Sequence, residues 1–251
     1  MERTFLLPGE HLEHLSSRVS VAVGNGYAFS TDTVLLAWYS LPKRGERCAD
    51  LGTGCGFIPL FWCARSAPSA VWAVEVQPEA CDMARRSVRE NGLEGTVRVA
   101  ECDVRGLSAA GCVPRGLDVV ACNPPYTAAG AGVPSAARRD RIARHETLCA
   151  FFDFAASAAG LLRWGGRFCC CLRPERLCGT VTDLRRAGLE PKRLRLVQQR
   201  KDAAPFLLLL QASRGGKPGL RVEPVLLLED DAGGVSEEML RVYGDYKEGR
   251  A

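Results

Sequence analysis

Strand-like apolar runs alternate with helix-like amphipathic stretches along most of this 251-residue chain. The predicted strands are 47–51, 70–75, 96–100, 117–122 and 167–172, and the predicted helices are a segment from Asp32 onward, 57–65, 78–91, 147–163 and 175–187. This alternation is typical of a mostly parallel sheet with helices on both faces. Two further runs, 189–199 and 206–212, have no helix between them and are expected to form an antiparallel hairpin. The predicted fold class is therefore α/β, with a seven-stranded sheet.

The chain is expected to have three parts around this Rossmann-like sheet. Residues 1–45 form an N-terminal lead-in that packs on the main domain, and its helix is capped by Thr31 or Asp32. Residues 46–212 form the main domain, in which a loop is predicted over 127–145. Residues 213–251 form a C-terminal tail that begins with a Gly-Gly-Lys-Pro-Gly turn.

The composition is that of a soluble globular protein, with 47% hydrophobic and 25% charged residues. No apolar run approaches the roughly 20 residues that span a bilayer, and the first residues lack a signal-peptide pattern, so a cytoplasmic protein is expected. The twelve cysteines include no Cys-x-x-Cys pair and are expected to be free thiols; Cys169, Cys170 and Cys171 lie on one strand and point to alternate faces. We predict no metal site.

Positive charge is unevenly distributed, although the net charge is only +4. Between 135 and 145 there are four arginines and one aspartate, and between 173 and 201 there are nine basic residues and three acidic ones. Clustered arginines suit contact with phosphate. The alternative, that each cluster is a solvated surface, stays open.

The segment Asp50-Leu-Gly-Thr-Gly-Cys-Gly56 lies between the first core strand and the following helix. Ligands of open α/β sheets bind at this end of the strands. The spacing is Gly-x-Gly-x-Gly rather than the Gly-x-Gly-x-x-Gly of dinucleotide sites. Asp50 would repel a pyrophosphate but would attract a sulfonium or ammonium group. The sequence therefore predicts S-adenosyl-L-methionine as the cofactor rather than NAD.

Acidic residues also follow the next two strands. Glu75 is placed to accept the ribose hydroxyls, and Asp103 to accept the adenine amino group while Val104 offers a backbone N–H. Alternatively, Glu75 is a charge at a helix N-terminus and Asp103 a turn residue. The predicted cofactor-binding residues are Thr31, Asp32, Asp50, Gly52, Thr53, Gly54, Gly56, Glu75, Val76, Asp103, Val104 and Asn123.

The tetrapeptide Asn123-Pro124-Pro125-Tyr126 follows the fourth core strand and is predicted to be catalytic. The prolines stiffen the main chain. The Asn123 side-chain oxygen and the Pro124 carbonyl can accept both hydrogens of a planar NH2 group, and Tyr126 can stack on its ring. The alternative is a rigid turn without chemistry.

These motifs resemble the class I S-adenosylmethionine-dependent methyltransferases of the Asn-Pro-Pro-Tyr amino-methylating group. More closely, the chain resembles the bacterial tRNA(Val) adenine-37 N6-methyltransferase family. The matching stretches are 29–37, 50–56, 123–126, 143–146 and 215–224. The resemblance implies methylation of adenine N6 beside the anticodon of tRNA. Because the cluster of Arg138, Arg139, Arg141 and Arg144 directly follows the catalytic turn, these arginines are expected to guide the RNA backbone. Residues 198–203 depart from the family pattern, which leaves an RNA contact there in doubt.

Other substrates remain open at this stage. A release-factor glutamine or a guanine N2 of rRNA presents the same delocalised nitrogen, although glutamine methyltransferases typically carry a helical domain before the glycine-rich loop, and only 49 residues precede it here. DNA methylation is disfavoured, because it would need a target-recognition domain for which the chain has no room. The alternative to an enzyme is a non-catalytic RNA-binding module that retains the fold. The sequence leaves open whether the protein is a monomer or a homodimer.

Overall fold

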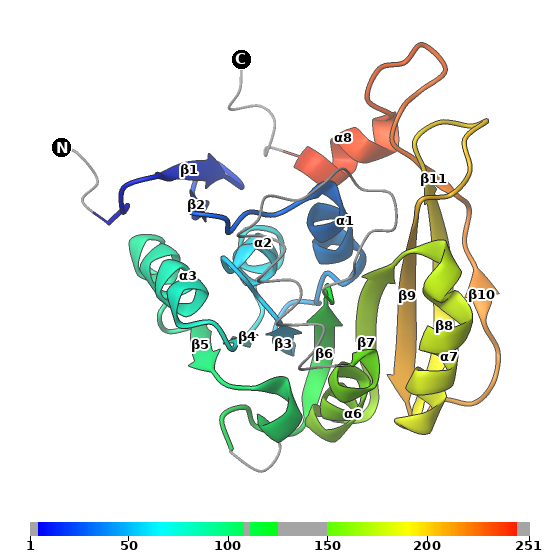
Figure 1. Cartoon of the computed structure of the whole chain (residues 1–251), viewed down its shortest axis with the longest axis horizontal. Coiled ribbons are helices and arrows are strands. Elements are labelled where there is room, and N and C mark those ends of the chain that lie inside the picture. Colours follow the sequence, from blue (N-terminus) through cyan, green and yellow to red (C-terminus); the bar gives the residue numbers. More distant parts are fainter. Residues whose placement is uncertain (1–4, 108–110, 125–149, 245–251) are drawn as a thin grey trace.

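The computed structural model describes residues 5–107, 111–124 and 150–244, and the structural statements below concern these residues. Its centre is a mostly parallel sheet (Figure 1). From one edge to the other the main strands are β5 (Val97–Glu101), β4 (Ala70–Glu75), β3 (Arg47–Leu51), β6 (Leu117–Cys122), β7 (Leu162–Leu172), β9 (Leu207–Arg214) and β8 (Leu189–Gln198). The first five are parallel to one another, and β9 is antiparallel to both β7 and β8. The predicted α/β class and the C-terminal hairpin are confirmed.

Helices cover both faces of the sheet, as predicted (Figure 1). One core layer contains buried side chains of α1 (Thr31–Tyr39), α2 (Phe57–Arg65) and α3 (Pro78–Glu90), and the other contains those of α6 (Phe151–Leu161) and α7 (Leu177–Arg186). Because successive strand residues point to opposite faces, Cys169 and Cys171 enter the first layer and Cys170 the second. All three are fully buried, as expected for small hydrophobic side chains.

The short elements near both ends of the chain were not predicted. A hairpin of β1 (Glu10–His14) and β2 (Ser20–Gly24) precedes α1 and is joined to α3 by the Arg86–Glu10 ion pair at 2.7 Å. Strands β10 (Arg221–Val222) and β11 (Leu226–Leu227) both pair with β8, so the sheet of the described residues has nine strands instead of the predicted seven. Helix α8 (Glu237–Tyr243) contacts α1. Two-residue strands and the polar sequence of β1 carry too weak a hydrophobic pattern to be recognised.

Element boundaries differ from the prediction at a few places. Ser30, not Thr31 or Asp32, is the N-cap of α1. Helix α6 ends at Leu161 because β7 already begins at Leu162, five residues before its predicted start. Helix α7 follows a turn of 3-10 helix, η2 (Pro174–Arg176).

One pair of cysteines forms a disulfide, so the prediction of free thiols is wrong for Cys102 and Cys112. Cys102 directly follows β5, and Cys112 lies in the segment that leads into β6; their Cα atoms are 7.1 Å apart. Spacing along the chain does not show which side chains a chain reversal brings together. No helix in the described ranges is long and apolar enough to cross a membrane.

Candidate active site

The carboxyl ends of β3, β4 and β6 lie side by side and carry the predicted site residues. In the sheet register Asp50 of β3 is opposite Ala73 of β4 and Ala121 of β6. Because these strands are parallel, the residues that follow them, including Asn123, lie at the same end of the sheet. This is the end where open α/β sheets bind their ligands.

The loop after β3 has a backbone shape that requires glycine. Gly52, Gly54 and Gly56 have φ values of +77°, +55° and +86°, in the left-handed region that side chains with a Cβ rarely adopt. A Cβ on Gly56 would also lie only 3.1 Å from the Ala84 Cβ. The N–H groups of Gly52 and Thr53 both donate to the Val74 carbonyl at 2.9 Å, which fixes the loop against β4.

Glu75, at the end of β4, is buried and holds this loop in place. One carboxylate oxygen accepts from the Gly54 N–H at 3.0 Å, and the other accepts from the N–H groups of Val76 and Gln77 at 2.9 and 3.0 Å. A carboxylate has about four acceptor positions, so this one retains capacity for a further donor. In the structure Glu75 therefore fixes the shape of the loop through its backbone hydrogen bonds. The sequence did not predict this role.

Asp50 is the opposite case, because its carboxylate is buried without compensation. Both of its oxygens and the Thr53 hydroxyl have no hydrogen-bond partner among the described residues. Burial raises the pKa of Asp50 to about 7, and the charge of Glu75 adds to the increase. A buried carboxylate of this kind is unfavourable alone and is stabilised by a cation.

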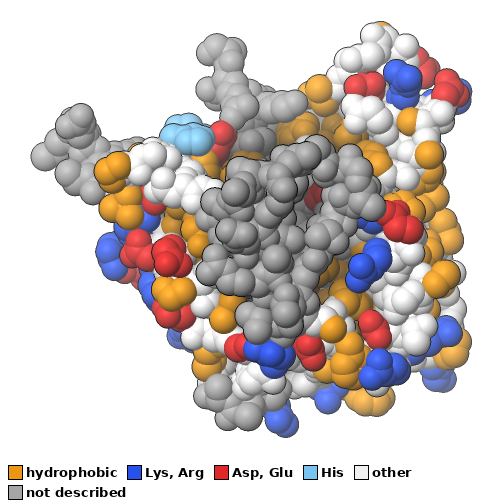
Figure 2. Space-filling model, in the orientation of Figure 1, with side chains coloured by type: hydrophobic (Ala, Val, Ile, Leu, Met, Phe, Trp, Pro, Cys, Tyr) orange, Lys and Arg blue, Asp and Glu red, His pale blue; other side chains and the backbone are white. Residues whose placement is uncertain are grey.

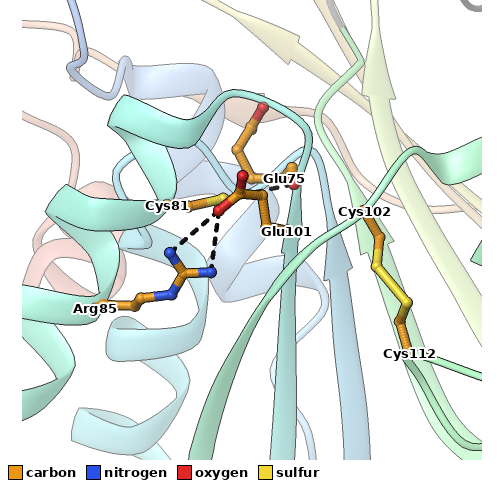
Figure 3. Close-up of a disulfide and its surroundings, with 6 residues drawn as sticks. All are labelled: Glu75, Cys81, Arg85, Glu101, Cys102 and Cys112. Atoms are coloured by element: carbon orange, nitrogen blue, oxygen red, sulfur yellow. Dashed lines mark hydrogen bonds and ion pairs between the residues drawn. A yellow bond between two sulfur atoms is a disulfide. The ribbon is translucent and has the colours of Figure 1, made fainter.

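The residues after β4 and β5 differ in exposure. The Val76 side chain is 43% exposed, although the five residues before it are all buried, so an apolar surface is open at this end of the sheet. Asp103 accepts from the Arg105 N–H at 2.9 Å and pairs with its guanidinium, and the Val104 side chain is buried. Figure 3 shows Glu101 paired with Arg85 and the Cys102–Cys112 disulfide nearby.

Asn123 lies where β6 ends and contacts two side chains that the sequence reasoning missed. Its Nδ2 donates to Thr33 Oγ1 at 3.0 Å, and its Oδ1 accepts from Cys171 Sγ at 3.1 Å. Asp32 is close enough to contribute to the raised pKa of the Cys171 thiol. The sheet register holds a signal for Cys171, because Cys122 pairs with Cys170 and the next residues on each strand are then neighbours.

Six predicted site residues lie outside the described part of the chain: Pro125, Tyr126, Arg138, Arg139, Arg141 and Arg144. The second basic segment, 173–201, is described, and four of its arginines form ion pairs with carboxylates. In Figure 2 positive and negative side chains are interspersed over the described part of this face. These four arginines are therefore paired with carboxylates rather than left open to phosphate, and Arg195 is also buried.

The residues at this end of the sheet fit S-adenosyl-L-methionine. The buried, unpaired Asp50 carboxylate suits a cationic group, the left-handed glycines let a ligand approach the backbone, and the exposed Val76 offers an apolar contact. A Rossmann-like sheet with such a site defines the class of S-adenosylmethionine-dependent methyltransferases.

Comparison with known proteins agrees with this class. The sequence profile of the methyltransferase small domain family matches residues 30–169, and the chain belongs to this family. It is 29% identical over 217 residues to the tRNA1(Val) (adenine(37)-N6)-methyltransferase of Tolumonas auensis, covering 86% of this chain and 88% of that protein. It is 31% identical over 132 residues to the release factor glutamine methyltransferase of Chlorobaculum tepidum, covering 48% of this chain and 43% of that protein.

Solved structures confirm the fold. A predicted O-methyltransferase from Agrobacterium tumefaciens superposes with a TM-score of 0.70 at 21% identity, covering 86% of this chain and 97% of that one. The 16S rRNA N2 G1207 methyltransferase of T. thermophilus, solved with AdoMet and guanosine, has a TM-score of 0.56 at 18% identity and covers 83% of this chain and 52% of that one. The chain is thus an S-adenosylmethionine-dependent methyltransferase.

Proposed function

We propose that this methyltransferase acts on the exocyclic N6 of adenine 37 in tRNA(Val), beside the anticodon. The observation that carries methylation of an amino group is the position of Asn123, whose amide lies at the end of β6 one strand away from the buried Asp50. The substrate is supported by the Tolumonas auensis relative, whose similarity extends beyond the family domain over 86% of this chain.

The chemistry of the acceptor depends on hydrogen bonds from the amino group to this chain. Asn123 Oδ1 accepts from Cys171 and has a second lone pair for a substrate N–H. We propose that this oxygen and the Pro124 carbonyl accept both amino hydrogens, which draws the N6 lone pair out of the ring. Pro125 stiffens the turn and Tyr126 stacks on the base. Positioning of this kind can lower a barrier by roughly 7–11 kcal/mol.

The methyl donor is proposed to occupy the ends of β3, β4 and β5. S-adenosyl-L-methionine supplies an activated methyl group on its sulfonium. Asp50 and Thr53 would hold a cationic part of it, Glu75 would accept from the ribose, and Asp103 with Val104 would face the adenine. Thr31 and Asp32, at the start of α1, and the three glycines complete this proposed site.

The tRNA is proposed to approach over the segment that follows the catalytic turn. Arg138, Arg139, Arg141 and Arg144 would contact its phosphates, so binding should weaken steeply with salt. An anticodon loop presents an unpaired base, which lowers the cost of bringing the adenine into the site. A tRNA substrate also implies a cytoplasmic enzyme.

A second candidate is methylation of a glutamine side chain in a release factor. It is favoured by the similarity to the Chlorobaculum tepidum enzyme, which spans 48% of this chain. The amide nitrogen of glutamine is as delocalised as adenine N6, so the Asn123 geometry would serve it equally.

The experiment offers the two methyl acceptors separately and compares the transfer of label. The protein is incubated with methyl-labelled cofactor and either bulk tRNA or a release factor, and the tRNA is then digested to nucleosides. We expect label in N6-methyladenosine, lost in Asn123→Ala. Label only in the release factor, or only in guanosine, would refute the proposal.

A further inference from the structure

The amide of Asn123 is held at both ends by side chains from different elements. Thr33, in the first turn of α1, receives its Nδ2 hydrogen at 3.0 Å, and Cys171, near the end of β7, donates to its Oδ1 at 3.1 Å. Three segments far apart in the sequence therefore meet at one side chain. An asparagine with a single contact can rotate about its last bond, whereas two contacts of opposite polarity define its orientation.

Cys171 acts as a donor in this arrangement. Its side chain is fully buried, and burial, followed by the charge of Asp32, raises the pKa of its thiol well above the ordinary value of 9.0. The sulfur therefore keeps its proton near neutral pH. A protonated thiol favours an oxygen rather than an NH2 group beside it, and so it selects the oxygen end of the amide.

Thr33 acts as an acceptor at the other end. Its Oγ1 already accepts from the Ser30 N–H at 3.3 Å, as part of the N-cap of α1. This bond fixes the position of the hydroxyl and leaves a lone pair for the Asn123 NH2 group. Turning the amide over would leave its NH2 group with only the Cys171 sulfur, a weak acceptor, and would move its oxygen to the Thr33 hydroxyl, where it would no longer be available to an incoming amino group.

We propose that Thr33 and Cys171 are positioning residues that fix the Asn123 amide with its oxygen available to the acceptor amino group. This inference rests on the proposed role of Asn123 in accepting amino hydrogens. Neither residue touches the reacting atoms in the proposal, so both act through Asn123. Their loss should lower kcat while the affinity for cofactor and the KM for tRNA stay unchanged.

The first test compares Cys171→Ala with Cys171→Ser. Losing one hydrogen bond should lower kcat by roughly fivefold, and serine, which restores a donor, should recover most of it. Cys170→Ala is the matched control, because Cys170 is equally buried on the same strand but points to the opposite core layer. It should lose similar stability and keep the wild-type kcat.

The second test applies the same logic to Thr33. Thr33→Val should lower kcat by roughly fivefold to tenfold, and Thr33→Ser should restore it. Ser30→Ala alters the cap of α1 without removing the Thr33 hydroxyl, so it separates helix capping from amide positioning. If Ser30→Ala lowers kcat as much as Thr33→Val, the positioning role of Thr33 is wrong.

A measurement without any methyl acceptor completes the test. In nitrogen-15 NMR of the protein with bound cofactor, the Asn123 NH2 group, assigned by its absence in Asn123→Ala, should give two sharp proton signals. They should broaden in Thr33→Val and Cys171→Ala but not in Cys170→Ala. Unchanged signals in both variants would overturn the inference, even if tRNA is not the substrate; failure of wild-type protein to methylate tRNA would refute only the proposed function.

Discussion

The two halves of the candidate site are built in different ways. The donor side, formed by the loop after β3 and the end of β4, uses charge and left-handed backbone: Asp50, Glu75 and the glycines. The acceptor side, formed by Asn123 with Thr33 and Cys171, uses neutral hydrogen bonds. A cationic cofactor requires charge, whereas a neutral amino group requires an oriented acceptor. Changes on the donor side should therefore alter cofactor affinity, and changes on the acceptor side should alter turnover.

The contrast continues within the donor side. Glu75 accepts three backbone hydrogen bonds, and Asp50 has no hydrogen-bond partner in the described ranges. The first carboxylate stabilises the fold of the loop, while the second is costly to the fold and useful only with a ligand. Two acids at neighbouring strand ends thus have different tasks, and substitution should separate them.

The largest effect is expected from Asn123→Ala. This change removes the amide oxygen that is proposed to accept a hydrogen bond from the substrate amino group. It should lower kcat by roughly 10²–10³-fold, the loss typical of one preorganised polar group at a reacting centre. Calorimetry should show an unchanged cofactor affinity. A large loss of cofactor binding would break the separation between the two halves.

Asp50→Asn should come next. Loss of a charge-assisted contact should weaken cofactor binding by roughly 10- to 100-fold. The same variant should melt a few degrees higher at pH 8, because it removes a buried charge that has no described partner. Asp118→Asn is the matched control, since Asp118 is at the opposite end of the neighbouring strand and pairs with Arg163. Wild-type affinity in Asp50→Asn would contradict the assignment.

Glu75→Gln should have the opposite effect on stability. A glutamine cannot accept from donors on both of its terminal atoms, so at least one backbone N–H of the loop is left unsatisfied. The free energy of unfolding should fall by about 1–3 kcal/mol, and the melting temperature should fall with it. Cofactor affinity should fall roughly tenfold. Glu79→Gln, on an exposed position of α3, should change neither quantity. Equal thermal shifts in the two variants would count against the role given to Glu75.

The smallest effect is the pH dependence of cofactor binding. With a pKa of about 7 in the free protein, Asp50 must lose a proton to bind a cation, so affinity should rise roughly eightfold between pH 6 and 7.5. Because this pKa lies above the ordinary value of 3.8, the free protein should lose stability as pH rises from about 4 to 7 and no more above it. Asp50→Asn should flatten the affinity profile; a slope that persists there would assign the titration to another group.

The sequence predicted well that the functional residues lie at the ends of successive strands, because each motif follows a strongly apolar strand. Asp50, Glu75 and Asn123 all lie at strand ends as expected. The residues that these side chains contact were harder to predict from the sequence. The three N–H groups on Glu75 depend on how the glycine loop folds back, and Cys171 reaches Asn123 only through the register of β6 and β7. The Cys102–Cys112 disulfide and the short β10 and β11 strands likewise depend on tertiary contacts that carry no local pattern.

The proposed substrate is tested by locating the transferred methyl group within tRNA(Val). The tRNA is methylated with purified protein, cleaved with a base-specific ribonuclease, and its anticodon-loop fragment is sequenced by mass spectrometry. We expect one added methyl group on adenine 37, present as N6-methyladenosine and absent with Asn123→Ala. A methyl group on another nucleotide, or an unmodified tRNA beside a methylated release-factor glutamine, would contradict the proposed substrate.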